Sequence, residues 1–399
     1  MRDCLCEKLY YDRGGSNGTS APTCTPCLLG ANCSVGGTTV ATLHLERGYW
    51  RANANSTRLY RCPDASAAST GCIGGVGDPC KASLRGAYCR VCVNDSWFYD
   101  EGASECRVCD ASTVFAANNM RAAIFLISIA CVALITTKAL QYRAPLRLHQ
   151  IYLASTRSSL TVKLRLLVTF FQIICRVPRV YLLEIPADLR RFIERFDLVL
   201  SLNLVTLVPL RCLGLRSFLQ ELIFTATAPL LFYVVVLALA ILRALARTAA
   251  GRSRWRTVAA SKERPGGKKA NARDLVSKAI LAGAPLCLFV AYLTMPYVSS
   301  LAFGAFNCEC FDDVCLMRVD FAVQCNSGGP SSPFTAEYNQ ILSAAAVVIV
   351  CYSFCTPLVF LLLLRRARVA ILSRHSTQLS RALAMLHSDY LPNRYYWEV

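Results

Sequence analysis

The sequence predicts a small disulfide-rich ectodomain followed by an all-α transmembrane bundle of about five helices, with the N-terminus outside and the C-terminus inside. Three observations predict this fold class. Twelve of the 22 cysteines lie within residues 1–110, long apolar runs follow, and the net charge of +18 lies entirely after residue 110. A mean hydropathy of +0.39 with 17% charged residues excludes a disordered chain and argues against an ordinary soluble enzyme.

Residues 1–110 form the predicted ectodomain. They carry eleven basic and eleven acidic residues and are therefore neutral. An even number of cysteines in a loop-rich segment is typical of a small extracellular module, which buries too little apolar surface to fold without disulfide bridges. The predicted disulfide cysteines of this region are Cys4, Cys6, Cys24, Cys27, Cys33, Cys62, Cys72, Cys80, Cys89, Cys92, Cys106 and Cys109.

Three Cys-x-x-Cys pairs lie among these cysteines, and the last two pairs are separated by 13 residues, close to zinc-ribbon spacing. Zinc is therefore the alternative to disulfides. The sequence favours disulfides because a glycosylation sequon at Asn94 lies between the two pairs, on a side of the membrane that is predicted to be oxidising. We expect no metal and no cofactor.

Four Asn-x-Ser/Thr sequons lie in the same region, and the sequence contains none elsewhere. They predict a lumenal or extracellular face, with glycosylation candidates at Asn17, Asn32, Asn55 and Asn94. Enzymatic removal of N-glycans is expected to shift the mobility of the protein on a gel. No secretory signal is visible, so either the first span carries the ectodomain across as a reverse anchor or, as the sequence favours, the true N-terminus is missing.

The transmembrane region is predicted over residues 111–364. A bilayer core about 30 Å thick needs roughly 20 mostly apolar residues in a helix. Four runs meet this requirement, and a fifth, interrupted run is needed to keep the lysine- and arginine-rich segments on one side. The predicted spans are residues 122–137, 164–184, 222–242, 279–308 and 338–364. They leave the basic segments 142–165, 243–278 and 365–399 inside and the segments 185–216 and 302–337 outside.

The outer loop 302–337 carries four further disulfide candidates. Their even count within a short segment predicts that they pair among themselves and close the loop into a cap over the last two spans. The cysteines are Cys308, Cys310, Cys315 and Cys325. Cys308 and Cys310 are expected to choose different partners, and a bond from the odd outer cysteine, Cys212, to this loop would contradict the idea. The loop also has five acidic residues against one arginine, which fits a solvated loop or a pore mouth that concentrates cations.

Three ionisable residues interrupt the span 164–184: Arg176, Arg179 and Glu184. Ionisable residues at membrane depth indicate a functional site by default, so these side chains are candidates to line a cavity or to form a pair. The alternative is that they anchor a short span at the interface. Prolines within the apolar runs likewise fit either structural kinks or the broken helices of channels and transporters.

The inner loop 243–278 carries eleven basic residues against two acidic ones. It is expected to bind anionic lipid or only to fix the topology. Nucleic acid is excluded as a partner because the loop is tethered to the membrane and has one aromatic residue, Trp255. The tail 365–399 is predicted to form an amphipathic helix that lies on the inner leaflet or docks on further spans. The leucines that share its apolar face are Leu372, Leu379, Leu383 and Leu386.

An ordered series of motifs resembles the ephrin-receptor-like cysteine-rich repeat of large multi-pass proteins from microbial eukaryotes. The motifs are 44–51 (His-Leu-Glu-Arg-Gly-Tyr-Trp-Arg), 60–62, 72–80, 86–92 and 106–109. Those proteins place such repeats before a membrane region related to transient-receptor-potential-like channels. The segments 170–172, 318–325 and 395–399 are similar to that region. The resemblance covers about residues 44–399, and it implies that the chain is a fragment whose gene continues into further spans.

Catalytic constellations are absent from the sequence, which has neither a His-Glu-x-x-His pattern nor a Walker loop. We therefore expect no enzyme. The first hypothesis is a multi-pass protein of the plasma membrane or an endomembrane, with a channel-like or transporter-like membrane region beneath a cysteine-rich cap. The second is a cell-surface receptor or adhesion protein whose helices serve as anchor and transducer. The expected partners are the lipid bilayer and an unknown extracellular ligand.

Overall fold

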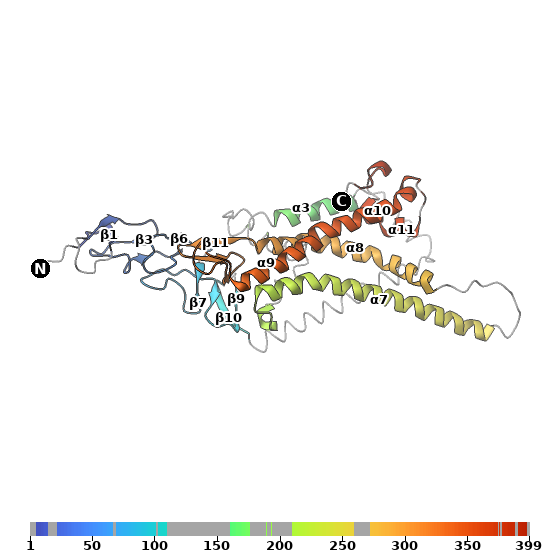
Figure 1. The fold of residues 1–399 in the computed structure, drawn as a ribbon, viewed down its shortest axis with the longest axis horizontal. Helices are drawn as coiled ribbons and strands as arrows, with labels where there is room; N and C mark the ends of the chain where they lie inside the picture. The colour runs from blue at the N-terminus through green and yellow to red at the C-terminus, as the bar shows by residue number, and fades with distance from the viewer. Residues whose placement is uncertain are drawn as a thin grey trace.

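A computed structural model gives the fold of this chain. It describes residues 5–14, 22–66, 69–100, 103–109, 160–175, 189, 193, 210–258, 272–373, 375, 377–387 and 390–396. The molecule is elongated. The cysteine-rich region lies at one end, and the long helices run along the longest axis from its base (Figure 1).

The described residues of the predicted ectodomain contain five two-stranded antiparallel ladders, β1–β2, β3–β4, β5–β6, β7–β8 and β9–β10. The elements are β1 Tyr10–Asp12, β2 Cys24–Pro26, β3 Ala31–Asn32, β4 His44–Leu45, β5 Tyr49–Trp50, β6 Tyr60–Arg61, β7 Leu84–Arg85, η1 Ala87–Cys89, β8 Val91–Cys92, β9 Trp97–Asp100 and β10 Glu105–Val108. An isolated two-stranded ladder is at best marginally stable in water. Disulfides supply the missing stability: Cys6 to Cys24, Cys27 to Cys33, Cys62 to Cys72, Cys80 to Cys89 and Cys92 to Cys106.

Within the described residues, three helices are long and apolar enough to cross a membrane: Phe218–Arg243, Val276–Gly304 and Ala336–Leu372. They confirm, as helices, the predicted spans 222–242, 279–308 and 338–364. The helical elements are α3 Leu160–Ile174, η2 Leu210–Leu213, α7 Phe218–Val258, α8 Ala272–Gly304, α9 Ala336–Ile349, the π-helical turn η3 Val350–Cys355 and α10 Thr356–Leu372. The predicted span 122–137 lies outside the described residues, and of the span 164–184 only the part in α3 and Cys175 is described.

The ends of two helices differ from the prediction. α7 continues past Arg243 to Val258, and α8 begins at Ala272, so much of the predicted inner loop is helical. Arginine and lysine are good helix formers, so a basic residue marks where a helix leaves the bilayer and not where it ends. At the other end, α8 stops at Gly304 because the chain enters a strand at Cys308.

The loop 302–337 contains a three-stranded antiparallel sheet in the order β11 Cys308–Phe311, β12 Val314–Met317 and β13 Asp320–Gln324. Cys310 lies opposite Cys315 in the ladder, and the two are bonded. Cys308 is bonded to Cys325, just after β13. The sheet rests on the ends of α7, α8 and α9 in a shared core that contains Phe218, Val298, Met317 and Ile341.

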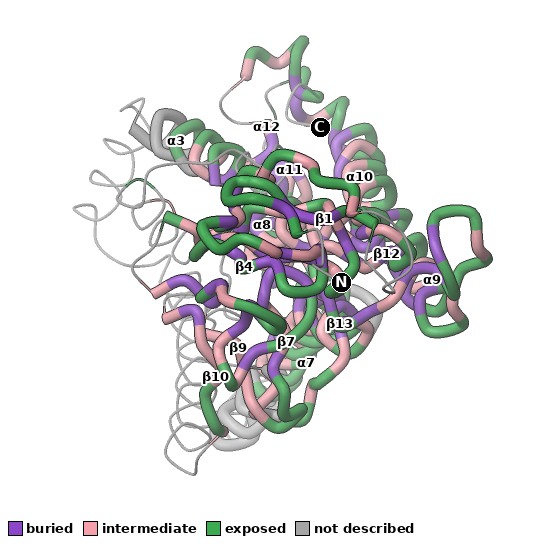
Figure 2. The backbone as a smooth tube through the Cα atoms, turned by 90° about the vertical axis from the view of Figure 1, so that its left-hand side faces the viewer, coloured by how far each residue is buried: buried purple, intermediate pink, exposed green. Residues whose placement is uncertain are grey.

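The tail is broken into α11 Gln378–Ala382, α12 Ala384–His387 and η4 Pro392–Arg394. Burial along α10 follows the helix period, at Phe360, Leu364, Ala367 and Ile371 (Figure 2). The tail packs back onto this face, where Leu383 and Leu386 are fully enclosed with Leu288 of α8. A single amphipathic helix is therefore wrong for the described residues, because Thr377 caps a new helix after the chain turns. Leu372 stays exposed.

Candidate functional site

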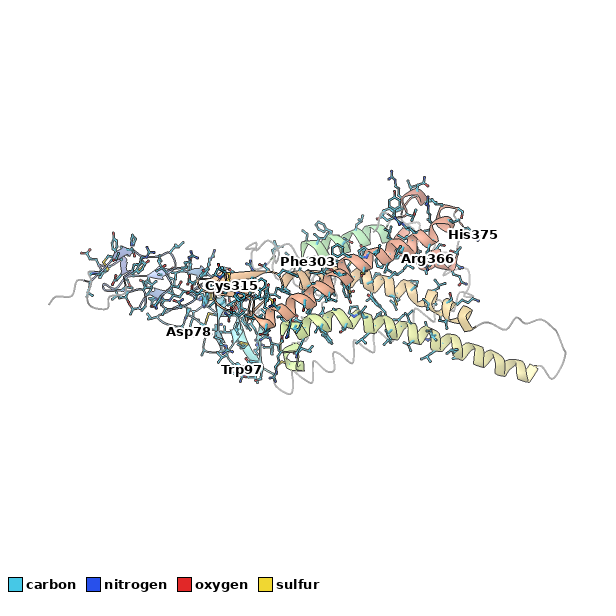
Figure 3. The ribbon with its side chains drawn as sticks, in the orientation of Figure 1. Asp78, Trp97, Phe303, Cys315, Arg366 and His375 are labelled. Carbon is cyan, nitrogen blue, oxygen red and sulfur yellow. A yellow bond between two sulfur atoms is a disulfide. The ribbon has the colours of Figure 1, made fainter. Side chains whose placement is uncertain are left out.

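The ectodomain and the long helices pack together at one junction, which is formed by the β11–β13 sheet and the adjoining helix ends. The β11–β13 sheet lies there between two apolar cores, with Cys315 at the boundary (Figure 3). Successive strand residues point to opposite faces of a sheet. Accordingly, Leu316 packs against the core of the ectodomain, whereas Cys315 and Met317 belong to the core of the helices.

Five rings fill the ectodomain side of this junction: Trp50, Tyr60, Tyr88, Phe311 and Phe321, hereafter the aromatic cluster. Phe311 comes from the outer loop and is 1% exposed. Its ring lies 5.1 Å from Tyr60, 5.2 Å from Trp50 and 5.4 Å from Tyr88, in edge-on geometry. Edge-on aromatic pairs contribute about 0.5–1.5 kcal/mol beyond their buried area. The cluster therefore attaches the outer loop firmly to the ectodomain.

A polar contact reinforces the cluster. The Tyr88 hydroxyl donates a hydrogen bond of 2.7 Å to Glu309 Oε1, across 221 positions of sequence. Burial, together with this carboxylate, raises the pKa of Tyr88 above its ordinary value. Arg318 Nε lies 3.9 Å from the other oxygen of Glu309. Tyr88 therefore stays a neutral donor at physiological pH, and the contact persists.

A second connection reaches the outer end of α7. Cys109, which follows β10, is bonded to Cys212 of η2 across 103 positions. The neighbouring Arg211 lies 3.4 Å from Asp320 of β13. Four residues separate η2 from the first helical residue of α7, so the base of the ectodomain is covalently fixed beside the start of this helix.

A third connection ties the sheet to α8 and α9. Thr335 caps α9 by accepting from the Tyr338 amide, and its hydroxyl donates to the Gln324 carbonyl at 2.7 Å. The Tyr338 hydroxyl donates to the Ala305 carbonyl at 3.0 Å, just beyond α8. Since Gln324 ends β13, one short stretch of chain links the sheet to both helices.

The three helices meet one another through polar contacts deeper in the bundle. The Tyr352 hydroxyl, in the π-helical turn η3, donates to the Ala226 carbonyl of α7. The adjacent Ser353 donates to Ser299 of α8 at 2.9 Å. π-helical turns occur frequently at functional sites, and α7 has a proline, Pro229, one turn from Ala226. This layer therefore combines contacts between the three helices with two departures from regular α-helical hydrogen bonding.

The structure places the predicted site residues unevenly. Asn32, Asn55 and Asn94 are exposed, which leaves these three sequons accessible to glycosylation, while Asn17 and Cys4 lie outside the described residues. Arg176, Arg179 and Glu184 also lie outside them. Cys212 forms a disulfide with Cys109 but is not among the predicted disulfide cysteines. The sequence did carry a signal for it, because Cys212 is the one unpaired cysteine in the segments predicted to lie outside.

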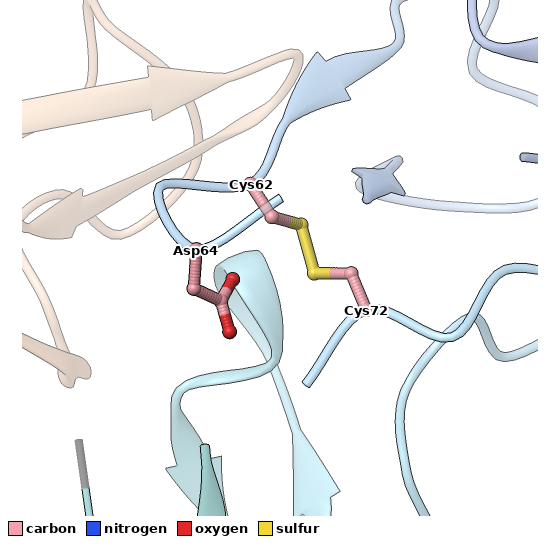
Figure 4. Close-up of side chains that lie close together, drawn as sticks. All are labelled: Cys62, Asp64 and Cys72. Atoms are coloured by element: carbon pink, nitrogen blue, oxygen red, sulfur yellow. A yellow bond between two sulfur atoms is a disulfide. The ribbon is translucent and has the colours of Figure 1, made fainter. Parts of the chain in front are cut away.

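In the part of the chain that the structure describes, one group has the residue types of a metal site: Cys62, Asp64 and Cys72, whose ligand atoms lie within 4.8 Å of one another. Both sulfur atoms are consumed by the disulfide between the two cysteines (Figure 4). The Asp64 carboxylate accepts a hydrogen bond of 2.9 Å from the Gly71 amide. The group is thus a closed structural element of the ectodomain.

Comparison with protein-family models, with curated proteins and with solved structures finds no match.

Proposed function

We propose that this chain is the membrane portion of a channel-like or transporter-like protein whose cysteine-rich ectodomain is a cap that moves with the helices. The observation that carries the proposal is the two-faced sheet. It packs against the aromatic cluster on one side and the helix ends on the other, while the bond from Cys109 to Cys212 reaches α7 separately. A cap joined in this way passes a displacement of the ectodomain to the helices.

The helices themselves support the channel-like or transporter-like reading. Prolines interrupt α7 and α8, and η3 is a π-helical turn in the third apolar helix. Such distortions free backbone carbonyls, and in membrane proteins freed carbonyls are tolerated where they line a cavity or meet a neighbouring helix. The proposal keeps five spans with the N-terminus outside, and it involves no catalysis and no cofactor. It also keeps the resemblance to transient-receptor-potential-like channels.

The second candidate is a cell-surface receptor or adhesion protein that binds an extracellular ligand. The same junction favours it, because coupling of a ligand-binding cap to the helices is sufficient for signalling without any permeation path. The basic continuation of α7 beyond Arg243 fits either candidate as a contact with anionic lipid of the inner leaflet.

Ion flux separates the two candidates. The full chain is reconstituted into liposomes, and cation and anion flux are measured for the wild type and for Cys212→Ser, which releases the covalent connection to α7. Flux in the wild type that changes in the variant supports the channel-like function. Intact, correctly inserted protein without flux of either kind of ion supports the receptor.

A further inference from the structure

Apolar side chains that are half exposed or partly buried lie around the outer ends of the three candidate spans. Val108 and the partly buried Trp97 lie beside the start of α7, Phe303, Phe306 and Val319 lie at the end of α8, and Phe334 lies before α9; these six residues are hereafter the outer collar. Figure 3 shows Trp97 and Phe303 near the base of the ectodomain, where the helices begin. Five of the six are about half exposed: Val108 55%, Phe303 54%, Phe306 51%, Val319 49% and Phe334 52%.

The β9–β10 hairpin shows how the ectodomain contributes to this collar. Tyr99 and Cys106 are opposite each other and pack against the aromatic cluster. Trp97 and Val108 are the next pair on the same face, because side chains of a strand alternate with period two. Val108 precedes Cys109, whose disulfide fixes this end of the hairpin beside η2. The apolar face is therefore filled at one end and open at the end nearest α7.

The other collar residues are held in place by the sheet and the helix ends. Val319 lies on Gly304, since a Cβ added to this glycine would meet Val319 Cγ2 at 2.8 Å. The Phe334 ring contacts Tyr338 edge-on at 5.2 Å. The described residues cover only about half of the surface of Val319 and Phe334, so a substantial apolar area is left exposed at this level.

Their height above the bilayer core follows from helix length. If Arg243 marks the inner boundary of α7, about 20 residues place the outer boundary near Ile223, between one and two turns from the first residue of α7, Phe218. Counting from Lys278, the same length ends near Val298, and Phe303 lies about 7 Å farther along α8. The headgroup layer extends roughly 5–8 Å beyond the hydrocarbon core on each side. The collar therefore lies at the level of the outer headgroups.

From this position we propose that the outer collar is a lipid-binding surface, in which the base of the ectodomain sits in the headgroup layer of the outer leaflet. The occupant is lipid because the collar continues the exposed apolar faces of the spans, at Ile223 and Phe224 of α7 and Phe289 of α8. Aromatic side chains at this level are characteristic of membrane interfaces. The inference rests on the proposed function, in which the helices are inserted in a membrane. It goes beyond that function in proposing that lipid also contacts the base of the ectodomain.

Tryptophan fluorescence tests the proposal, because the chain has four tryptophans. Trp255 and Trp397 are replaced by phenylalanine, and Trp50→Phe or Trp97→Phe then leaves a single reporter. Each variant is placed in nanodiscs of phosphatidylcholine brominated near the glycerol end of its acyl chains. Trp97 is expected to lose emission relative to unbrominated lipid, whereas Trp50, enclosed in the aromatic cluster, is expected to keep it. A variant with Phe334→Trp as the sole reporter repeats the test at a second collar position.

Two outcomes overturn the proposal. Quenching of Trp97 by aqueous iodide but not by brominated lipid would place the collar in water. Resistance to both quenchers would mean that protein covers it, either another part of this chain or a second copy. Alkaline carbonate extraction of membranes is measured in parallel, because release of the protein there would refute membrane insertion itself and not the collar.

Discussion

Truncation of Phe311 tests whether the aromatic cluster joins the outer loop to the ectodomain. The ring is 1% exposed and contacts Trp50, Tyr60 and Tyr88 within 5.4 Å. Replacing a buried phenylalanine by alanine costs about 3–5 kcal/mol through lost contacts and the cavity left behind. Because each 1.4 kcal/mol is a factor of ten, opening of the β11–β13 sheet in Phe311→Ala is expected to become roughly a hundred to a few thousand times more frequent.

Hydrogen–deuterium exchange of the protein in nanodiscs measures this opening. Protection of the β11–β13 amides is expected to fall by the same factor in Phe311→Ala, while the β1–β2 ladder at the far end of the ectodomain keeps its protection. Phe303→Ala is the matched control, since it removes the same ring from an exposed position at the end of α8. If both variants lose the same protection in the sheet, the cluster does not hold the junction and the reasoning fails.

Three further predictions concern neighbouring contacts. Gly283→Val is expected to lower the thermal midpoint, because a Cβ added at Gly283 meets side chains of α7 at 3.3–3.4 Å and such overpacking costs about 1–3 kcal/mol. Ala282→Val is the control: Ala282 is exposed, so the thermal midpoint of this variant should change little. A protease cut engineered between residues 111 and 209 should leave two fragments that migrate together without reductant, and Cys212→Ser should separate them; separation in the wild type contradicts the bond to Cys109. Because folding raises the pKa of Tyr88, the neutral hydroxyl contributes to the free energy of unfolding. This contribution is fully present below about pH 10 and is lost as the pH rises through the folded-state pKa. Tyr88→Phe should therefore make the thermal midpoint fall less steeply above about pH 10.

The apolar helices were predictable from the sequence because the bilayer imposes a length. The runs 222–242 and 338–364 need no tertiary information, since a charge-free stretch of more than 20 residues has few other uses. The helix ends were less predictable. Charge marks the membrane boundary, whereas the end of α7 at Val258 depends on backbone propensity beyond that boundary.

The contacts of the junction were out of reach for a different reason. Tyr88 and Glu309, like Cys109 and Cys212, are separated by more than 100 residues, and no local periodicity connects them. The strands β11–β13 could not be predicted from the sequence either. Each has only four or five residues, so at most two or three positions can show the alternation of apolar and polar side chains that identifies a strand. Trp50 belongs to the motif at residues 44–51, but its role in the aromatic cluster follows only from the arrangement in space.

The covalent structure of the junction determines which movements of the ectodomain reach the helices. The disulfides of Cys308 and Cys310 close the sheet at both ends, so its strands cannot slip in register and the sheet moves as one body. It bears on the ends of α7, α8 and α9, and the bond to Cys212 adds a covalent connection beside the start of α7. Because this connection is made next to α7 alone among the three candidate spans, a rotation of the ectodomain about the sheet is expected to displace α7 relative to α8 and α9. The contact that must respond is the one between the Ala226 carbonyl and the Tyr352 hydroxyl, where α7 meets the π-helical turn. Loss of that hydrogen bond in Tyr352→Phe is thus expected to alter the response of the helices while leaving the ectodomain intact.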